Sequence, residues 1–525
     1  MGKPKSTNGT KADLRGVKKQ GSTAQEYVLA TGPVISVAVV VFVAVLFRWA
    51  VGLGPYSGEQ KAPMFGDYEA QRHWMEITYN LPVQQWYVNS SQNDLLYWGL
   101  DYPPLTAYHS WILGAVSNYL NASWVRLGES RGHESYEHKL FMRYSVLSAD
   151  FLTLIPALLV YVYNCQTPNP HYFSKCTLLL TCLLNPSLLL IDYGHFQYNC
   201  VSLGLFVWAV VAVIANQDLA ASLLFVLALN YKQMELYHAL PFFCYLLGSC
   251  LRLGPWNGLS KLVKLSLVVV GSFGIVWLPF LFDLRSAVQV LHRIFPFARG
   301  LYEDKVANVW CSLSVLVKFK QILSIDQVLK LSGVVSVLCL LPTNLMLLYK
   351  PTKRQFRLSL CLSSLVFFLF SFQVHEKNIL QVIVPILLIF HEESVLAAHF
   401  TLISAISLYP LCVKDKLEVA FYALFFLHYI WLTDVLQLQR LWEYKRKVRI
   451  FRMHVFSFHS SVIVGILLCI SSVFLEAPPR FPDLFPLLNS IYCCAHFLLT
   501  FCYLLYRQYV DCFVVIVVTR KLKKS

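Results

Sequence analysis

The sequence predicts an all-α polytopic membrane protein, in which a bundle of apolar helices crosses the bilayer about fourteen times. The chain of 525 residues is 57% hydrophobic and only 14% charged, whereas soluble domains carry about 25% charged residues. Its apolar residues gather in runs close to the roughly 17–25 residues that a membrane-spanning helix needs. The net charge of +15 fits the enrichment of Lys and Arg in cytoplasmic loops better than it fits a nucleic-acid-binding surface.

The first elements are a polar tail, one apolar run and a long polar loop. Residues 1–26 contain six Lys or Arg and two acids, which predicts a disordered cytoplasmic tail. The run at 33–52 is too long for the apolar region of a signal peptide and lacks a small-residue cleavage site, so we expect a first span there. Residues 53–137 contain four Lys or Arg and nine Asp or Glu. A basic segment before the span and an acidic one after it place this large loop on the lumenal side.

Thirteen more apolar runs complete the predicted bundle. They lie near 141–163, 174–191, 197–215, 219–231, 236–251, 262–283, 326–349, 357–372, 378–392, 395–412, 417–435, 455–475 and 485–506. Fourteen crossings from a cytoplasmic start put the most basic segments outside the N-terminal tail in the cytoplasm. These segments are 350–357, 436–454 and 507–525. Because charge and count agree, we expect one membrane domain over residues 27–519, with a second lumenal loop at 284–325 and a short basic tail at 520–525.

Short signals in the chain bear on its compartment. The fifteen cysteines lie mostly in apolar runs, without a C-x-x-C pair, which predicts free, buried thiols. The sequons that begin at Asn89 and Asn121 fall in the large loop, as expected of a lumenal segment. Lys521 and Lys523 match either a cytosolic di-lysine signal for return to the endoplasmic reticulum or the basic flank of the last span.

The same topology places five polar clusters on the lumenal side. They are GDYEAQRHW (66–74), IDYGHFQYN (191–199), NYKQMELYH (230–238), FPFARGLYEDKVANVW (295–310) and FQVHEKN (372–378). Each mixes charges with aromatic rings, unlike a solvated turn built from Gly, Asn and Ser. The sequence has no P-loop, G-x-G-x-x-G, H-E-x-x-H, G-x-S-x-G or D-x-D motif, so the common soluble-enzyme chemistries are not indicated. Asp67-Tyr68-Glu69 is the nearest approach to a metal-binding D-x-D, and because its alternate carboxylates could share a hard cation, metal binding stays a minor alternative.

A carboxylate in such a pocket is a candidate general base. Asp67 or Asp101 could accept the proton of a sugar hydroxyl while the oxygen attacks a sugar carbon. Nearby cations would stabilise a phosphate leaving group through charge-assisted hydrogen bonds. The candidate cations are Arg72, Arg293, Arg299, Lys305 and Lys377. A lipid-linked donor would also explain the many spans, because its polyprenyl tail must lie in the bilayer while its phosphate reaches the surface.

The sequence leaves alternatives open for these residues. Asp67 is a favoured N-cap residue for a helix that begins at Tyr68, and Asp101 precedes two prolines and suits an ordinary turn. The HEK stretch at 375–377 suits a solvated connector, and Asp150 suits an ion pair within the bundle. A transporter or lipid flippase without transfer chemistry is the alternative from another class. Transporters place ionisable groups near the midplane, whereas here they concentrate at the lumenal ends, which favours an enzyme.

Several longer stretches resemble the endoplasmic-reticulum glucosyltransferases that use dolichyl phosphate glucose. They are FGDYEAQRHW, LPVQQWY, YWGLDYPPLTAYHS, LIDYGHFQYN, NYKQMELYHALPFF, RGLYEDKVANVWC and FSFQVHEKNIL. They occur in the family's order and cover nearly the whole chain. QRHWMEIT and WGLDYPPLTAYHS are most similar to the member that adds the first glucose, and the member that adds the second glucose is the alternative within the family.

The resemblance implies a GT-C fold, with a multispan helical bundle and a large first lumenal loop that carries the catalytic carboxylate. It implies inverting transfer of glucose from dolichyl phosphate glucose to Man9GlcNAc2-diphosphodolichol, with an α-1,3 bond as product. We expect no metal cofactor. Both lipid-linked substrates would meet at a lumenal site in the endoplasmic reticulum membrane. Asp67 matches the family's base. The expected substrate-binding residues are Glu69, Arg72, His73, Asp101, Arg299, Glu303, Asp304, His375, Glu376 and Lys377.

Overall fold

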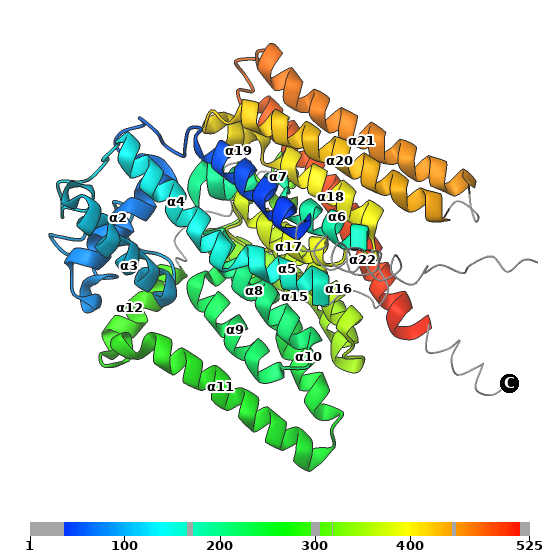
Figure 1. Cartoon of the computed structure of the whole chain (residues 1–525), viewed down its shortest axis with the longest axis horizontal. Coiled ribbons are helices and arrows are strands. Elements are labelled where there is room, and N and C mark those ends of the chain that lie inside the picture. Colours follow the sequence, from blue (N-terminus) through cyan, green and yellow to red (C-terminus); the bar gives the residue numbers. More distant parts are fainter. Residues whose placement is uncertain (1–35, 165–171, 296–304, 318, 444–447, 515–525) are drawn as a thin grey trace, which may run out of the picture.

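The computed structural model describes residues 36–164, 172–295, 305–317, 319–443 and 448–514, and every regular element in them is a helix (Figure 1). The helices are Ser36–Gly52, α2 Gly66–Asn80, α3 Pro104–Leu120, α4 Tyr136–Leu152, α5 Leu154–Asn164, α6 Tyr172–Leu183, α7 Pro186–Leu189, α8 Asn199–Ile214, α9 Asp218–Tyr231, α10 Ala239–Leu251, α11 Pro255–Leu281, α12 Leu284–Ile294, α13 Val309–Leu313, α14 Phe319–Ile322, α15 Ile325–Tyr349, α16 Lys353–Phe370, α17 Leu380–Leu388, α18 Ser394–Ser407, α19 Tyr409–Lys414, α20 Glu418–Glu443, α21 Val448–Phe474 and α22 Leu484–Tyr509. Short tighter or wider helical segments join them, namely η1 Val83–Gln85, η2 Ala122–Trp124, η3 Leu190–Phe196, η4 Gln233–His238, η5 Glu376–Ile379 and η6 Val510–Val514.

The apolar helices confirm the predicted class of a polytopic helical membrane protein. Each predicted apolar run coincides with helix in the described part of the chain. Seven helical segments are long and apolar enough to cross a membrane, or eight if Lys175–Leu183 and Pro186–Phe196, which meet at a bend of 41°, form one span. Ser36–Gly52, α8 and α9 are apolar but shorter. The count of about fourteen crossings therefore stays a prediction.

Polar residues and prolines define where the apolar helices begin. Ser324 and Gln327 form a reciprocal capping box at the start of α15, which satisfies backbone N–H groups that the first turn leaves unpaired. Asn185 caps α7 and is followed by Pro186, whose missing N–H costs nothing at that position. The helix boundaries thus follow from local chemistry, while the apolar faces between them pack into the bundle.

The predicted loop at 53–137 folds into a compact unit, which we call the loop lobe. Helices α2 and α3 pack against each other within it, and both lie at one edge of the molecule near α12 (Figure 1). The lobe contributes Trp74, Ile77 and Trp86 to an apolar core that is separate from the main core of the bundle. Phe280 of α11 and Val290 of α12 belong to the same core. This packing fixes the lobe to the bundle and brings the start of α2 to the ends of other helices.

Buried charges and thiols in the bundle follow the sequence expectations. Asp150 pairs with Arg48 of the first helix at 2.7 Å and accepts a hydrogen bond from the Tyr193 hydroxyl at 2.7 Å. The prediction that Asp150 forms an ion pair within the bundle is therefore confirmed. The pair links the helix Ser36–Gly52 to α4. Every cysteine in the described residues is free, and most are buried.

Candidate active site

Asp67 lies in the first turn of α2, after a tight left-handed turn. The helix begins at Gly66, and the cap position belongs to Phe65, which makes no side-chain cap bond. Gly66 has φ 69°, and a Cβ there would lie 2.6 Å from the Ser57 carbonyl oxygen. Glycine is therefore required at this crossing of two chain segments. The N-cap alternative for Asp67 is wrong, because its carboxylate turns instead to distant parts of the chain.

One oxygen of Asp67 receives three donors. Gln197 Nε2 lies 2.5 Å and His195 Nε2 lies 3.0 Å from Oδ2, and the Lys377 ammonium contacts the same oxygen. Oδ1 accepts no hydrogen bond from the described residues, and the side chain is 22% exposed. The arrangement therefore holds the carboxylate through one oxygen and leaves the other open for an incoming hydroxyl.

The surrounding cations control the charge of Asp67. Burial alone would raise the pKa of Asp67, but the positive charges of Lys377 and His195 outweigh it and hold that pKa well below its usual range. Burial alone would lower the pKa of Lys377, but the Asp67 charge raises it above its usual value. Both groups are consequently ionised at neutral pH. The carboxylate is ready to accept a proton, and a cation stands beside it where a leaving phosphate needs one.

A second ammonium group lies close to this carboxylate. Lys232, at the end of α9, donates to Gln197 Oε1 at 2.8 Å and to Asn199 Oδ1 at 2.5 Å. Its Nζ also lies 4.9 Å from the centre of the Tyr102 ring. The side chain is buried, no carboxylate of the described residues contacts it directly, and burial together with the charge of Lys377 lowers its pKa. Two neighbouring buried ammonium groups favour an anion between them.

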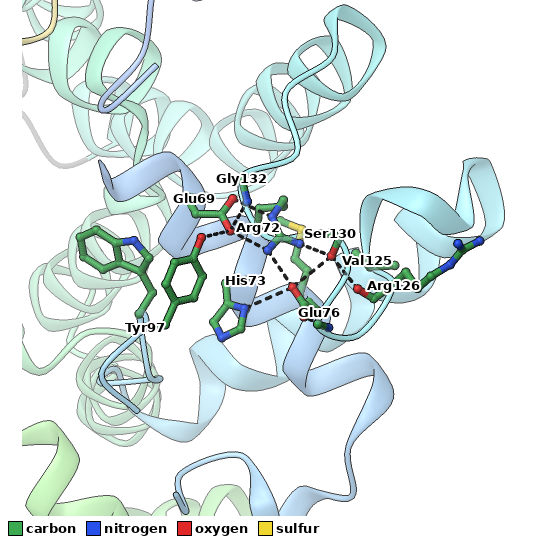
Figure 2. A network of polar contacts seen from close by, with 12 residues as sticks. Glu69, Arg72, His73, Glu76, Tyr97, Val125, Arg126, Ser130 and Gly132 are labelled. Atoms are coloured by element: carbon green, nitrogen blue, oxygen red, sulfur yellow. Dashed lines mark hydrogen bonds and ion pairs between the residues drawn. The ribbon is translucent and has the colours of Figure 1, made fainter. Parts of the chain in front are cut away.

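Three of the predicted substrate-binding residues lie in a separate buried network instead (Figure 2). Arg72 donates to Glu69, Glu76, Ser130 and the Trp124 carbonyl, with distances of 2.6–3.2 Å. His73 Nδ1 lies 3.2 Å from Glu76, and Glu69 also accepts bonds from Tyr97 and from Gly132 N–H. Arg72 and His73 are fully buried. These contacts leave Arg72 no free N–H for a phosphate. Its substrate-binding role stays a prediction, and the geometry argues against it.

Of the other predicted substrate-binding residues, some lie at or near Asp67 and three lie outside the described ranges. Lys377 contacts Asp67, and Asp101 and Glu376 both contribute negative charge around Lys377. His375 is the cap residue of η5, directly before Glu376. Arg299, Glu303 and Asp304 lie outside the described residues.

Two candidate cations serve other parts of the structure. Arg293 donates to the Gly99 carbonyl at 2.7 Å and to the Leu100 carbonyl at 3.2 Å, so it supports the segment that leads to Asp101. Lys305 pairs with Asp483 at 2.9 Å. Within the described ranges, no group of three or more His, Cys, Asp or Glu side chains is arranged to hold a metal ion.

Four residues around Asp67 were not singled out from the sequence. His195, Gln197 and Lys232 belong to polar clusters at the ends of predicted helices, so the sequence located them without separating them from their neighbours. Asp415 contacts His195 Nδ1 at 2.6 Å, and its only sequence signal was an acid at the end of an apolar run. Nothing local to these residues indicates that they meet at one carboxylate.

Comparison with known proteins identifies relatives along most of the chain. A model of the ALG6, ALG8 glycosyltransferase family matches residues 44–504. The protein named Dolichyl pyrophosphate Man9GlcNAc2 alpha-1,3-glucosyltransferase from Gallus gallus is 50% identical over 477 residues, which cover 88% of this chain and 94% of that protein. The protein of the same name from Mus musculus is 48% identical over 478 residues, with 88% and 94% covered. The Caenorhabditis elegans protein with that name, there marked probable, is 43% identical over 471 residues, with 89% and 88% covered.

Proposed function

The chain belongs to the ALG6, ALG8 glycosyltransferase family, and we propose that it transfers the first glucose onto lipid-linked Man9GlcNAc2. The product carries an α-1,3 bond between the glucose and the oligosaccharide on diphosphodolichol. The observation that carries the proposal is the 50% identity, over 88% of the chain, to a relative named for that acceptor and that bond. The other relatives named above carry the same acceptor in their names, which favours it over the acceptor of the second-glucose enzyme.

In this proposal the donor is dolichyl phosphate glucose, and the glucose transfers in one displacement with inversion at C1. The acceptor hydroxyl oxygen forms a bond to C1 while the bond from C1 to the phosphate oxygen breaks, and dolichyl phosphate leaves with the electron pair. The hydroxyl proton passes to Asp67 Oδ1, the oxygen that accepts no hydrogen bond from the described residues. A well-placed base of this kind contributes about 10²–10⁴ to the rate.

Lys377 is the proposed ligand of the donor phosphate. Its ammonium already contacts Asp67, and Lys232 is close enough that the two positive charges affect each other. A phosphate between them would gain charge-assisted hydrogen bonds, and these strengthen as negative charge develops on the leaving group. We propose that no metal ion takes part, because the ammonium groups of Lys377 and Lys232 supply the positive charge that a leaving phosphate needs.

We place this site on the lumenal face of the endoplasmic reticulum membrane, in a GT-C bundle of about fourteen spans. The distribution of basic segments supports this orientation, and the sequon residues Asn89 and Asn121 are both exposed on the loop lobe. An endoglycosidase should therefore reduce the apparent mass of the cellular protein, and the double variant Asn89→Gln, Asn121→Gln should lack that change. Absence of glycan on the parent protein would contradict the lumenal assignment.

The activity is tested with purified protein in lipid nanodiscs, a short-chain dolichyl phosphate glucose analogue and lipid-linked oligosaccharide. We expect transfer to the Man9 acceptor, much less to the Glc1Man9 acceptor, and no loss of rate with EDTA. Asp67→Asn should retain donor binding and lose turnover by about 10²–10⁴, whereas Asp326→Asn, which removes a largely exposed carboxylate on α15, should not. Preference for Glc1Man9 would identify the second-glucose activity, and near-normal transfer by Asp67→Asn would exclude Asp67 as the base.

A further inference from the structure

His195 has a carboxylate on each of its ring nitrogens. Nε2 lies 3.0 Å from Asp67 Oδ2, and Nδ1 lies 2.6 Å from Asp415 Oδ2. The side chains of His195 and Asp415 are 5% and 2% exposed, so solvent does not substitute for either contact. Asp415 follows α19 and is 220 residues from His195 along the chain. The imidazole is therefore the link between the candidate base and a buried carboxylate behind it.

Hydrogen bonds from one imidazole to two carboxylates require a proton on each ring nitrogen. A neutral imidazole has a single N–H, so one of its nitrogens would direct a lone pair at a carboxylate oxygen. An imidazolium donates to both carboxylates. Asp67 also contacts the Lys377 ammonium, so among the groups in direct contact two carboxylates face two cations. Such balance is what burial of charged groups demands. Lys232 lies nearby and donates to Gln197 and Asn199 instead.

The backbone around His195 fixes the direction of its ring. His195 belongs to η3, a π-helical segment, and such segments are frequent at functional sites. Its carbonyl accepts a bond from Ser57 N–H at 3.1 Å, and the Gly194 carbonyl accepts one from Arg143 Nη2 at 3.0 Å. Two further charged groups lie at this segment in the described residues. Arg143 contacts its backbone rather than the ring, and Asp192, within η3, accepts from Asn199. Phe196, which follows, is fully buried with φ 87°, a strained conformation for a residue other than glycine.

We propose that Asp415 is a positioning residue for the glucosyl transfer and acts through His195. Asp415 keeps the second proton on the imidazole, so that Nε2–H holds Asp67 Oδ2 and Oδ1 remains directed at the acceptor hydroxyl. Asp415 itself touches neither substrate in this assignment. The inference rests on the proposed role of Asp67 as the base, and it extends that role to a residue from the C-terminal half of the chain.

Removal of the Asp415 charge should change both the rate and its dependence on pH. In Asp415→Asn the imidazolium is less stable, and a neutral ring that keeps its proton on Nδ1 presents a lone pair to Asp67. The carboxylate then loses a donor and a nearby positive charge, so its pKa rises. Because Asp67 must be ionised to act as a base, the acid limb of the profile of kcat against pH, where kcat falls as the pH is lowered, should move to higher pH. A purely structural role for Asp415 would not move this limb.

The test compares Asp415→Asn, Asp415→Glu and His195→Gln with Asp326→Asn as the matched surface control, in nanodiscs. We expect Asp415→Asn to lower kcat about 10–100-fold, as for outer partners that orient a functional histidine, with KM values for both substrates close to the parent. Asp415→Glu should restore part of kcat and the position of the acid limb. His195→Gln, which keeps one donor to Asp67 but cannot carry charge, should resemble Asp415→Asn.

Two results would overturn the assignment of Asp415. One is a parent-like kcat and acid limb for Asp415→Asn. The other is an equal loss for Asp415→Asn and Asp415→Glu with an unmoved acid limb, since that pattern means lost packing. The proposed function fails separately, through absence of transfer by the parent protein or through near-normal transfer by Asp67→Asn. The position of the acid limb therefore tests the positioning role of Asp415 once loss of turnover in Asp67→Asn has established Asp67 as the base.

Discussion

Replacement of Arg72 by Met should loosen the loop lobe rather than weaken substrate binding. The guanidinium of Arg72 is fully buried and uses all of its N–H donors (Figure 2). Its partners are Glu69, Glu76, Ser130 and the Trp124 carbonyl. Arg72→Met keeps much of the side-chain volume, but it leaves two carboxylates buried in the same place without their cation.

The expected cost follows from this pairing. Removal of one partner from a buried ion pair destabilises a protein by about 3–5 kcal/mol. One cation here serves two carboxylates, at 2.6 Å and 2.7 Å, so we expect about 4–5 kcal/mol, the upper part of that range. Since each 1.4 kcal/mol or so changes an equilibrium constant tenfold, the equilibrium constant for local opening of the lobe should rise roughly 10³-fold.

Hydrogen exchange followed by mass spectrometry measures this opening directly. Peptides that cover α2 and residues 124–132 should exchange faster in Arg72→Met, while peptides from the bundle keep their rates. Arg126→Met is the matched control, because Arg126 pairs with Glu129 at 3.0 Å on the exposed surface of the same lobe and such pairs contribute only about 0–1 kcal/mol. Unchanged exchange in Arg72→Met together with a raised KM for either substrate would refute the structural role and restore the substrate-binding one.

Three further predictions concern charge. Lys377→Met should raise the donor KM about 10–100-fold, which corresponds to the loss of one charged hydrogen bond. It should also move the acid limb of the kcat–pH profile to higher pH, because Asp67 loses its neighbouring cation. An unchanged donor KM would exclude Lys377 from the phosphate site. Burial would raise the pKa of Glu76, but the His73 hydrogen bond and the Arg72 charge lower it to about 2 from 4.5. The ionised Glu76 therefore stabilises the folded lobe by about 3 kcal/mol above pH 4.5, and this contribution is lost as the pH falls towards 2. The protection of the α2 peptide, its exchange rate relative to the intrinsic rate at the same pH, should fall across that window in the parent protein and vary less in Glu76→Gln. Activity measured after EDTA treatment should equal the untreated rate, and recovery only on addition of a divalent cation would contradict the metal-free mechanism.

The spacing of charges along α2 illustrates where sequence reasoning succeeds and where it stops. Asp67, Glu69 and Arg72 lie within six positions of one another, and the sequence assigns all three to one substrate site. On the helix they point to different surroundings. Asp67 turns to His195 and Lys377, whereas Arg72 turns into the lobe. A periodicity argument places residues on faces of a helix, but it does not say what lies opposite each face.

The sequence by itself determined the helical membrane class, the positions of the apolar segments, the resemblance to a glycosyltransferase family and the choice of Asp67 as the candidate base. These properties are local, since hydropathy, capping residues and continuous motifs act over one or two turns of chain. Only the tertiary structure decided that Lys377, 310 residues away, meets Asp67, and that Asp415 stands behind His195. Such contacts depend on how whole helices pack, and packing is set by the shapes of many side chains together rather than by the chemistry of any single stretch.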